Sequence, residues 1–343
     1  MTDDTGPHDL RHHGDVEVDA GMDDFAVNVR GDRPPEWLRH RLVEAVDRLA
    51  SYPSAAEDLE VRQRVAQRHN RTPDEVLLLA GAAEGFAMLP RLRSRLAAVV
   101  HPSFTEPEFA LRSADVPVHR VVLSAPYRLA DADVPGEADL VVLGNPTNPT
   151  SVAHPRADVL ALRRPGRIVV VDEAFADTMP GEPESVASIT APDVVVLRSL
   201  TKSFALAGLR CGYVLASPEI LATLSHGRAH WPLGTLQLAA IAACCEPAAV
   251  AAVEADASVL ASEREYMIGR LRGLGVDVLT PASASFLLVR VDGGAAVRER
   301  LRRRGIAVRR CDTFPGLTSD HLRLAVRGKD AVDRLVAALR EVA

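Results

Sequence analysis

The sequence contains very little lysine. Of its 343 residues, 40 are lysine or arginine, and Lys202 and Lys329 are the only lysines. A reaction that needs a primary amine therefore has two candidate residues, because the arginine guanidinium stays protonated and forms no Schiff base. The ordinary role of a single lysine is a solvated surface charge. Whether either lysine has a chemical role must therefore be judged from the residues around it.

A basic excess, a long apolar run and paired cysteine motifs are also missing. The net charge is −6, which argues against a nucleic-acid-binding face because neutralising phosphates needs surplus positive charge. No apolar run approaches the ~20 residues of a membrane helix, and the polar start has no apolar signal core. The four cysteines form no C-x-x-C pair. We therefore predict no metal site, no disulfide framework, and buried thiols in a cytoplasmic protein.

Apolar residues make up 47% of the chain and fall into short runs with helical segments between several of them. Uninterrupted apolar runs suit strands that are covered on both faces, as in a parallel sheet. The pattern predicts an α/β fold with a mostly parallel sheet of about seven strands. The runs are 76–80, 97–100, 118–123, 140–143, 168–171, 194–197 and 213–216.

The pattern changes towards the C-terminus, which predicts a second and smaller α/β domain. A mostly helical stretch over 218–272 leads into shorter strand patterns with two further helices. We therefore divide the chain into an N-terminal arm (1–35), a large domain (36–230), and an inter-domain helix with a small C-terminal domain (231–343).

Loops that follow predicted strands carry unusual residues, and ligands of open α/β sheets bind at the carboxyl ends of the strands. The turn GAAEG at 81–85 could offer backbone N–H groups to a phosphate at a helix start, or be a plain turn. The loop NPTNPT at 145–150 has two Asn-Pro steps, which favour extended backbone at each asparagine. This loop is either merely rigid or aims the Asn148 amide into a cleft.

Two further loops carry opposite charges. Asp172 ends the run VVVD, where it could meet a buried cation, lie in solvent, or hold magnesium. The magnesium alternative needs a G-x-x-x-x-G-K-[ST] loop, which neither lysine supplies. Lys202 follows another strand, within SLTKSFALAGLR at 199–210. If these strands share one sheet, Lys202, Asp172, Asn148 and the 81–85 turn converge at one edge of it.

Such a convergence meets the needs of pyridoxal phosphate. That cofactor requires an amine for a Schiff base, a carboxylate for its ring nitrogen, a donor for its phenolate oxygen and a cradle for its phosphate. The motifs NPTNPT, VDEAF and SLTKSFALAGLRCGY, in this order, resemble the fold-type I aminotransferases of class I and II. The resemblance extends over about 25–342 and is strongest to histidinol-phosphate aminotransferases and to the threonine-phosphate decarboxylases of cobalamin biosynthesis.

The resemblance implies cofactor contacts for a set of residues in these loops. Lys202 matches the Schiff-base lysine, and Asp172 matches the partner of the ring nitrogen. Asn148 matches the donor to the phenolate oxygen, and Phe104 matches the aromatic ring that stacks on the cofactor. The residues that the resemblance places around the phosphate are Ala82, Ala83, Ser199, Thr201 and Arg210.

A small amino-acid substrate and a homodimer are implied in the same way. Arg323 matches the arginine that binds the substrate carboxylate, and Arg309 matches a second substrate-side arginine. Asn28 is a further substrate-binding candidate, although its segment lacks the family's Asn-Pro. Tyr52 matches a tyrosine that reaches the cofactor phosphate of the partner subunit.

Several positions depart from the aminotransferase pattern. Phe175 stands where most of these enzymes have a tyrosine that hydrogen-bonds the phenolate oxygen, and Ser151 replaces a glycine. DEAF with Phe175, the HHGD start at 12–15 and the run 310–317 are typical of the decarboxylase branch. His12 and His13 either belong to this decarboxylase-like motif or lie in a disordered N-terminal tail.

Three functions are therefore open. The first is a pyridoxal-phosphate-dependent aminotransferase acting on a small or phosphorylated amino acid, which is favoured because transamination is common in the wider family. The second is decarboxylation of L-threonine O-3-phosphate. The third is a catalytically idle protein that only binds the cofactor.

Overall fold

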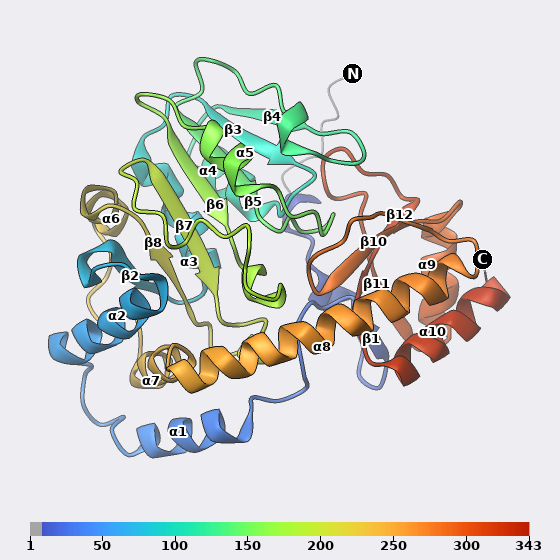
Figure 1. Cartoon of the computed structure of the whole chain (residues 1–343), viewed down its shortest axis with the longest axis horizontal. Coiled ribbons are helices and arrows are strands. Elements are labelled where there is room, and N and C mark those ends of the chain that lie inside the picture. Colours follow the sequence, from blue (N-terminus) through green and yellow to red (C-terminus); the bar gives the residue numbers. More distant parts are fainter. Residues whose placement is uncertain (1–8, 343) are drawn as a thin grey trace.

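The computed structural model describes residues 9–342 and contains the seven predicted strands in one sheet. They are β2 (Val76–Leu79), β3 (Ala97–His101), β4 (Val118–Val122), β5 (Leu140–Gly144), β6 (Ile168–Asp172), β7 (Val194–Ser199) and β8 (Gly212–Leu215). Their order is β2-β8-β7-β6-β5-β3-β4, and β8 runs antiparallel to β2 and β7 (Figure 1). The prediction of a mostly parallel sheet is confirmed.

Both faces of this sheet are covered, which is why its strands read as uninterrupted apolar runs. Along β6, Val169 and Val171 belong to the core on one face and Val170 to the core on the other. A strand alternates its side chains between the two faces, so burial on both sides requires apolar residues throughout. The accompanying helices are α1 (Glu36–Val46), α2 (Ala55–His69), α3 (Ala82–Met88), α4 (Glu106–Ser113), α5 (Arg156–Ala161), α6 (Pro218–Ser225) and α7 (Thr235–Cys244).

The strand register brings the loops that carry chemistry to one edge of the sheet. Gly144 at the end of β5 pairs with Asp172 at the end of β6, and Asp172 pairs with Leu197 of β7. The loops after β5 and β6 therefore start level with one another, and β7 extends two residues further, to Ser199. Because β8 runs in the opposite direction, its first residues lie at this same edge, and Arg210 lies two residues before Gly212.

A second sheet lies beside the first and includes a strand from the N-terminal arm (Figure 1). Its order is β1 (Asp23–Phe25), β11 (Ile306–Arg310), β12 (His321–Ala325), β10 (Phe286–Arg290) and β9 (Asp277–Val278). Strand β1 runs parallel to β11, so the arm extends the small C-terminal sheet. The helices of this part are α8 (Pro247–Arg272), α9 (Gly294–Arg303) and α10 (Lys329–Val342). Residues 1–8 of the predicted arm lie outside the described residues.

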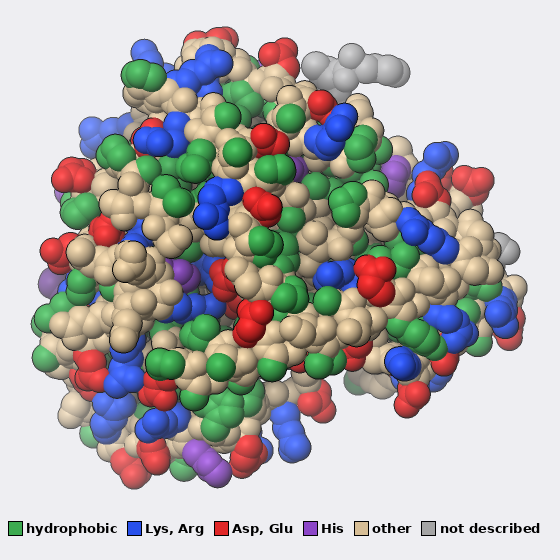
Figure 2. All heavy atoms as spheres, viewed as in Figure 1, with side chains coloured by type: hydrophobic (Ala, Val, Ile, Leu, Met, Phe, Trp, Pro, Cys, Tyr) green, Lys and Arg blue, Asp and Glu red, His purple; other side chains and the backbone are tan. Residues whose placement is uncertain are grey.

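The surface mixes charges of both signs. Acidic and basic side chains are interspersed over the face shown in Figure 2. Within residues 9–342, no single helix is long and apolar enough to span a membrane; α7 and α8 qualify only as a pair that is bent by 68°. The four cysteines are buried free thiols, as predicted.

Candidate active site

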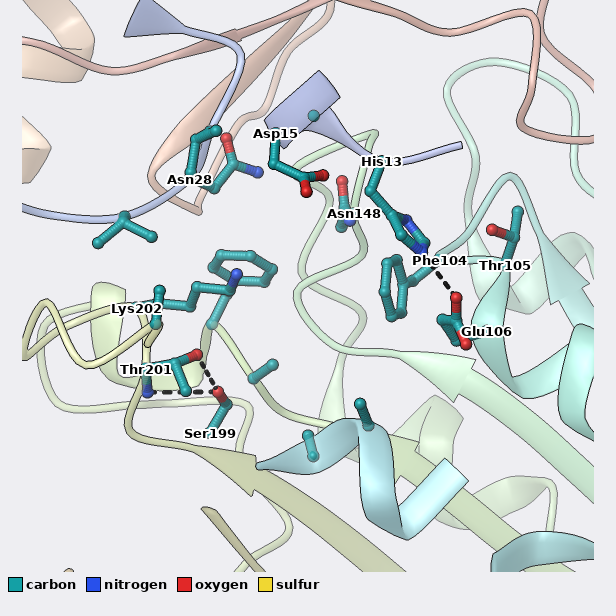
Figure 3. Close-up of a pocket in the computed structure, with 18 of the residues that line it drawn as sticks. His13, Asp15, Asn28, Phe104, Thr105, Glu106, Asn148, Ser199, Thr201 and Lys202 are labelled. Carbon is teal, nitrogen blue, oxygen red and sulfur yellow. Dashed lines mark hydrogen bonds and ion pairs between the residues drawn. The ribbon is translucent and has the colours of Figure 1, made fainter. Parts of the chain in front are cut away.

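A cavity of about 500 Å³ lies at the carboxyl edge of the large sheet and is lined by residues from both sheets (Figure 3). The structure brings nearly all of the predicted site residues to this cavity. Those that line it are Asn28, Ala82, Ala83, Phe104, Asn148, Asp172, Ser199, Thr201, Lys202, Arg210, Arg309 and Arg323. Residues at or after the ends of five strands of the large sheet and on two strands of the small one therefore build a single pocket.

Lys202 and Asp172 are the central charged groups of the pocket. Asp172 is the last residue of β6, and Lys202 lies in the turn after β7. Burial, reinforced by the positive charges of Arg323 and Arg210, lowers the pKa of Lys202 from 10.5 to about 8. Burial raises the pKa of Asp172 to about 6, against a hydrogen bond from the Ala174 backbone N–H. Lys202 thus loses its proton close to neutral pH, which makes it a nucleophilic amine.

One end of the pocket gathers groups that suit an anion. The first residues of α3, Ala82 and Ala83, follow β2 through Gly81, which has a φ of +81°. A Cβ on Gly81 would lie 2.8 Å from Nη2 of Arg210, so glycine here leaves room for that guanidinium. The hydroxyl oxygens of Ser199 and Thr201 lie 2.7 Å apart at the same edge. Hydroxyls, a guanidinium and a helix start are the donors that phosphate prefers.

The loop after β5 is tied to the small sheet and its neighbouring loop. Nη1 of Arg323 donates to Oδ1 of Asn148 at 2.6 Å, so the amide nitrogen of Asn148 is left to donate to a ligand. Ser151 has a φ of +63°, a conformation that favours glycine. Its Oγ accepts hydrogen bonds from the backbone N–H groups of Ser283 at 3.1 Å and Ala284 at 2.8 Å. These bonds explain how serine replaces the glycine of the family pattern.

Two buried arginines lie side by side where the small sheet lines the pocket. Arg309 and Arg323 are paired across β11 and β12, and each is at most 5% exposed. Arg309 donates to the carbonyl of His12 at 2.6 Å and to Thr313 Oγ1 at 2.8 Å. Burial, together with the charge of Arg309, lowers the pKa of Arg323 to about 9. Within the described part of the chain, neither forms an ion pair with a carboxylate, so this pair favours an anionic ligand.

Asn28 completes the surroundings of Arg323. With its amide oxygen facing the guanidinium, Asn28 accepts from Nε at 3.3 Å and from Nη1 at 3.2 Å. Asn28 therefore helps to hold the arginine in place at the pocket wall, in addition to lining the pocket itself.

Two phenylalanines form apolar walls. Phe175 packs its edge against Phe286, with ring centroids 4.9 Å apart, and its own ring lies 5.9 Å from Nζ of Lys202. Lys202 is thus faced by an aromatic ring in the place where the family pattern has a hydroxyl. Phe104 lies next to His13, with 5.4 Å between the ring centroids.

Tyr52 does not line the pocket of its own chain. Its side chain is 74% exposed, and its ring stacks on Trp231 at 4.3 Å. If Tyr52 contacts a pocket of this kind, that pocket therefore has to belong to another subunit.

Part of the pocket wall comes from residues 11–15, for which no site role was predicted from the sequence. His13 Nε2 lies 2.6 Å from Oε1 of Glu106, and Asp15 also lines the pocket (Figure 3). His12 lies beside His13, and its Nε2 contacts Oε1 of Glu17 at 2.9 Å. The described His12 and His13 therefore belong to the pocket wall. The HHGD motif pointed to this segment, whereas no sequence signal marked Glu106.

The order of these elements and the contents of the pocket agree with a comparison to known families. The model of the aminotransferase class I and II family matches residues 24–339. The chain belongs to this family. Its members are enzymes that use pyridoxal phosphate, so the predicted family, enzyme class and cofactor are confirmed.

Individual relatives fall on both branches that the sequence suggested. A Mycobacterium tuberculosis protein named histidinol-phosphate aminotransferase is 56% identical over 331 residues, covering 96% of this chain and 90% of that protein. The threonine-phosphate decarboxylase of Salmonella typhimurium is 29% identical, covering 93% and 90%. In structure, the histidinol-phosphate aminotransferase of Clostridium acetobutylicum has a TM-score of 0.84 at 22% identity, covering 93% of this chain and 98% of that one.

Proposed function

We propose that this enzyme transfers the amino group of a phosphorylated amino compound. The buried Arg309–Arg323 pair beside Lys202 carries the proposal, because two arginines without carboxylate partners are suited to a doubly charged anion such as a phosphate ester. The 56% identity to a protein named histidinol-phosphate aminotransferase supports the same substrate class.

The residues around Lys202 are suited to hold pyridoxal phosphate. Ser199, Thr201, Arg210 and the start of α3 would bind its phosphate, and Asp172 would face its ring nitrogen. When bound, the cofactor supplies an aldehyde that links to an amine and a protonated ring that draws electrons from the carbon bearing the amine. We assign Asn148 as the donor to the phenolate oxygen and Phe104 as the ring-stacking residue.

The remaining charged groups would orient the substrate and move its proton. Arg323 and Arg309 would bind the anionic group and so fix the carbon that bears the amine against Lys202. With its pKa lowered to about 8, Lys202 can accept a proton from that carbon and return it to a neighbouring atom. Both Phe104 and Phe175 line the pocket and keep water from this proton transfer.

A second candidate function is decarboxylation of threonine phosphate. This substrate has two anionic groups, a carboxylate and a phosphate, and Arg309 and Arg323 line the pocket side by side. Phe175 beside Lys202 also fits the decarboxylase branch, to which the Salmonella relative belongs by name. We rank it second because the relative named as an aminotransferase is much closer in sequence.

The two functions differ in their products. Incubating the cofactor-loaded enzyme with histidinol phosphate and 2-oxoglutarate should produce glutamate at the rate at which the amine is consumed. Threonine phosphate without a keto acid should release no CO2 above a Lys202→Ala blank. Stoichiometric CO2 from threonine phosphate, with no glutamate from histidinol phosphate, would replace the first function by the second.

We also propose a homodimer in which Tyr52 reaches the cofactor phosphate of the other subunit. Exposed apolar side chains cluster in sequence around the C-terminal half of α1, where Val43, Val46 and Leu49 are each at least 50% exposed. The stacked pair of Tyr52 and Trp231 adds two exposed aromatic rings. Covering such side chains by a second subunit would remove apolar surface from water.

We further propose that the protein is cytoplasmic, because a reducing compartment suits its free thiols.

The lowered pKa of Lys202 predicts how cofactor uptake depends on pH. Only the neutral amine attacks an aldehyde, so the uptake rate of the cofactor-free protein should rise with pH, reach half of its maximum near pH 8 and level off above about pH 9. Stopped-flow absorbance with pyridoxal phosphate would measure this rate. A rate that keeps rising to about pH 10, as for an exposed lysine, would contradict the lowered pKa.

A further inference from the structure

The pocket is closed on one side by a covering segment, which we define as residues 10–17. On the side of the large sheet, the carbonyl of Leu10 accepts a hydrogen bond from Thr105 Oγ1, and His13 contacts Glu106 at 2.6 Å. The ring of His13 also packs near Phe104 (Figure 3). These contacts fix the segment to the start of α4.

The small domain holds the other end of the covering segment. Glu17 is 4% exposed and pairs with Arg298 of α9, and the carbonyl of His12 accepts from Arg309. A segment anchored at both ends presents the side chains between its anchors in fixed positions. Asp15 lies between these anchors.

Asp15 is an acid without a partner in the described residues. Three acids line the pocket: Glu106 is occupied by His13, and Asp172 lies at the cofactor end near Lys202. Asp15 is exposed to solvent, its carboxylate accepts no hydrogen bond and joins no ion pair within residues 9–342, and Figure 3 shows it directed into the pocket. Its charge acts on Lys202, which places it within electrostatic reach of the reacting amine.

The position of Asp15 restricts what a substrate can place beside it. A phosphate or carboxylate would be repelled by Asp15 and attracted by Arg309 and Arg323, so these three residues together set one orientation for a bound anion. A carboxylate is an acceptor only, so its favourable partner is a nitrogen or oxygen that donates a hydrogen bond. Such a donor must be distinct from the amine that reacts at Lys202.

We infer that Asp15 is a specificity residue that selects substrates with a second hydrogen-bond donor. The inference rests on the proposed function and narrows it. Histidinol phosphate has a ring N–H left over once its amine and phosphate are bound. Threonine phosphate has none, because its hydroxyl is esterified. Asp15 therefore favours amino compounds that combine a phosphate at one end with a donor-bearing, uncharged or cationic side group at the other.

The experiment compares two substrates that differ chiefly in this donor. The cofactor-loaded enzyme is given histidinol phosphate or phenylalaninol phosphate, whose ring has a similar size and no N–H. We expect Asp15→Asn to reduce the preference for histidinol phosphate in kcat/KM by about 10-fold, with phenylalaninol phosphate unaffected. Asp133→Asn, which removes the same charge from an exposed position that does not line the pocket, should keep the wild-type preference.

Calorimetry separates this inference from the proposed function. The ratio of the two dissociation constants can be measured on each variant whether or not the compounds are turned over. Loss of the preference in Asp15→Asn, without glutamate production by the wild type, would support Asp15 and reject the transaminase. An equal preference in wild type and Asp15→Asn, or no preference in the wild type, would overturn the role of Asp15. Asp15→Glu should restore part of the preference if the carboxylate is what matters.

Discussion

Replacing Lys202 by alanine should lower turnover by about 10³-fold or more and abolish the visible absorbance of the covalently bound cofactor. The structure gives two reasons for so large an effect. Lys202 is the pocket's sole primary amine among the described residues, and its lowered pKa supplies a proton acceptor near neutral pH. Acid–base transfer alone contributes ~10²- to 10⁴-fold to such reactions. Turnover and absorption spectra of the purified variant would measure both losses.

The composition of the chain provides a matched control. Lys329, the other lysine, begins α10, and its Nζ lies 5.4 Å from the Tyr266 ring, outside the pocket lining. Lys329→Ala should therefore retain both activity and colour. Borohydride reduction of the loaded wild-type protein, followed by peptide mass spectrometry, should mark Lys202. A label on Lys329, or activity that survives in Lys202→Ala, would contradict the assignment.

Replacing Asp172 by asparagine should reduce activity by about 10²- to 10³-fold, because a cationic ring nitrogen would lose its buried carboxylate partner. The same change should stabilise the cofactor-free protein. Burial raises the pKa of Asp172 from 3.8 to about 6. An acid whose folded-state pKa is raised costs stability at pH above that value, and the cost disappears as pH falls below the unfolded value. Near pH 8, we expect the cofactor-free variant to be more stable by about 1–3 kcal/mol.

Thermal unfolding of the cofactor-free protein would test whether Asp172→Asn raises or lowers the folding stability. The gain from Asp172→Asn should shrink as pH is lowered from about 8 towards about 4. Asp139 offers a control of opposite sign: against the effect of burial, hydrogen bonds from Ser94 and Arg95 lower its pKa to about 2. Asp139→Asn should therefore destabilise the protein at the higher pH. A cofactor-free Asp172→Asn protein that melts below wild type at every pH would refute the buried-charge argument.

The large sheet and the cofactor end of the pocket were predictable because their signals are local. Strands buried on both faces must be apolar at every position, so each appears as a run, such as VVV at 169–171. The polar residue that ends the run then marks the edge of the sheet, as Asp172 does after β6. Lys202 was visible for a different reason, since the chain offers so few lysines.

Features that depend on distant contacts were not predictable from local pattern. His13 is paired with Glu106, which is 93 residues away, and Glu17 is paired with Arg298, which is 281 residues away. Strand β1 has no apolar run and exists because β11 accepts it as a neighbour. Helix α1 stops at Val46, and Leu49, three residues beyond its end, is exposed although it is apolar. At the end of α1, an apolar residue in the sequence is therefore not a sign of burial within this chain.

The covering segment has a practical consequence for anyone who produces this protein. Because Leu10 and its neighbours are fastened to the rim of the pocket, the described part of the chain begins beside the entrance. An affinity tag or fusion partner placed there would compete with incoming amines for space. The opposite terminus follows α10, which contributes no residue to the pocket lining and lies at the outer side of the small sheet in Figure 1, so it is the safer point of attachment.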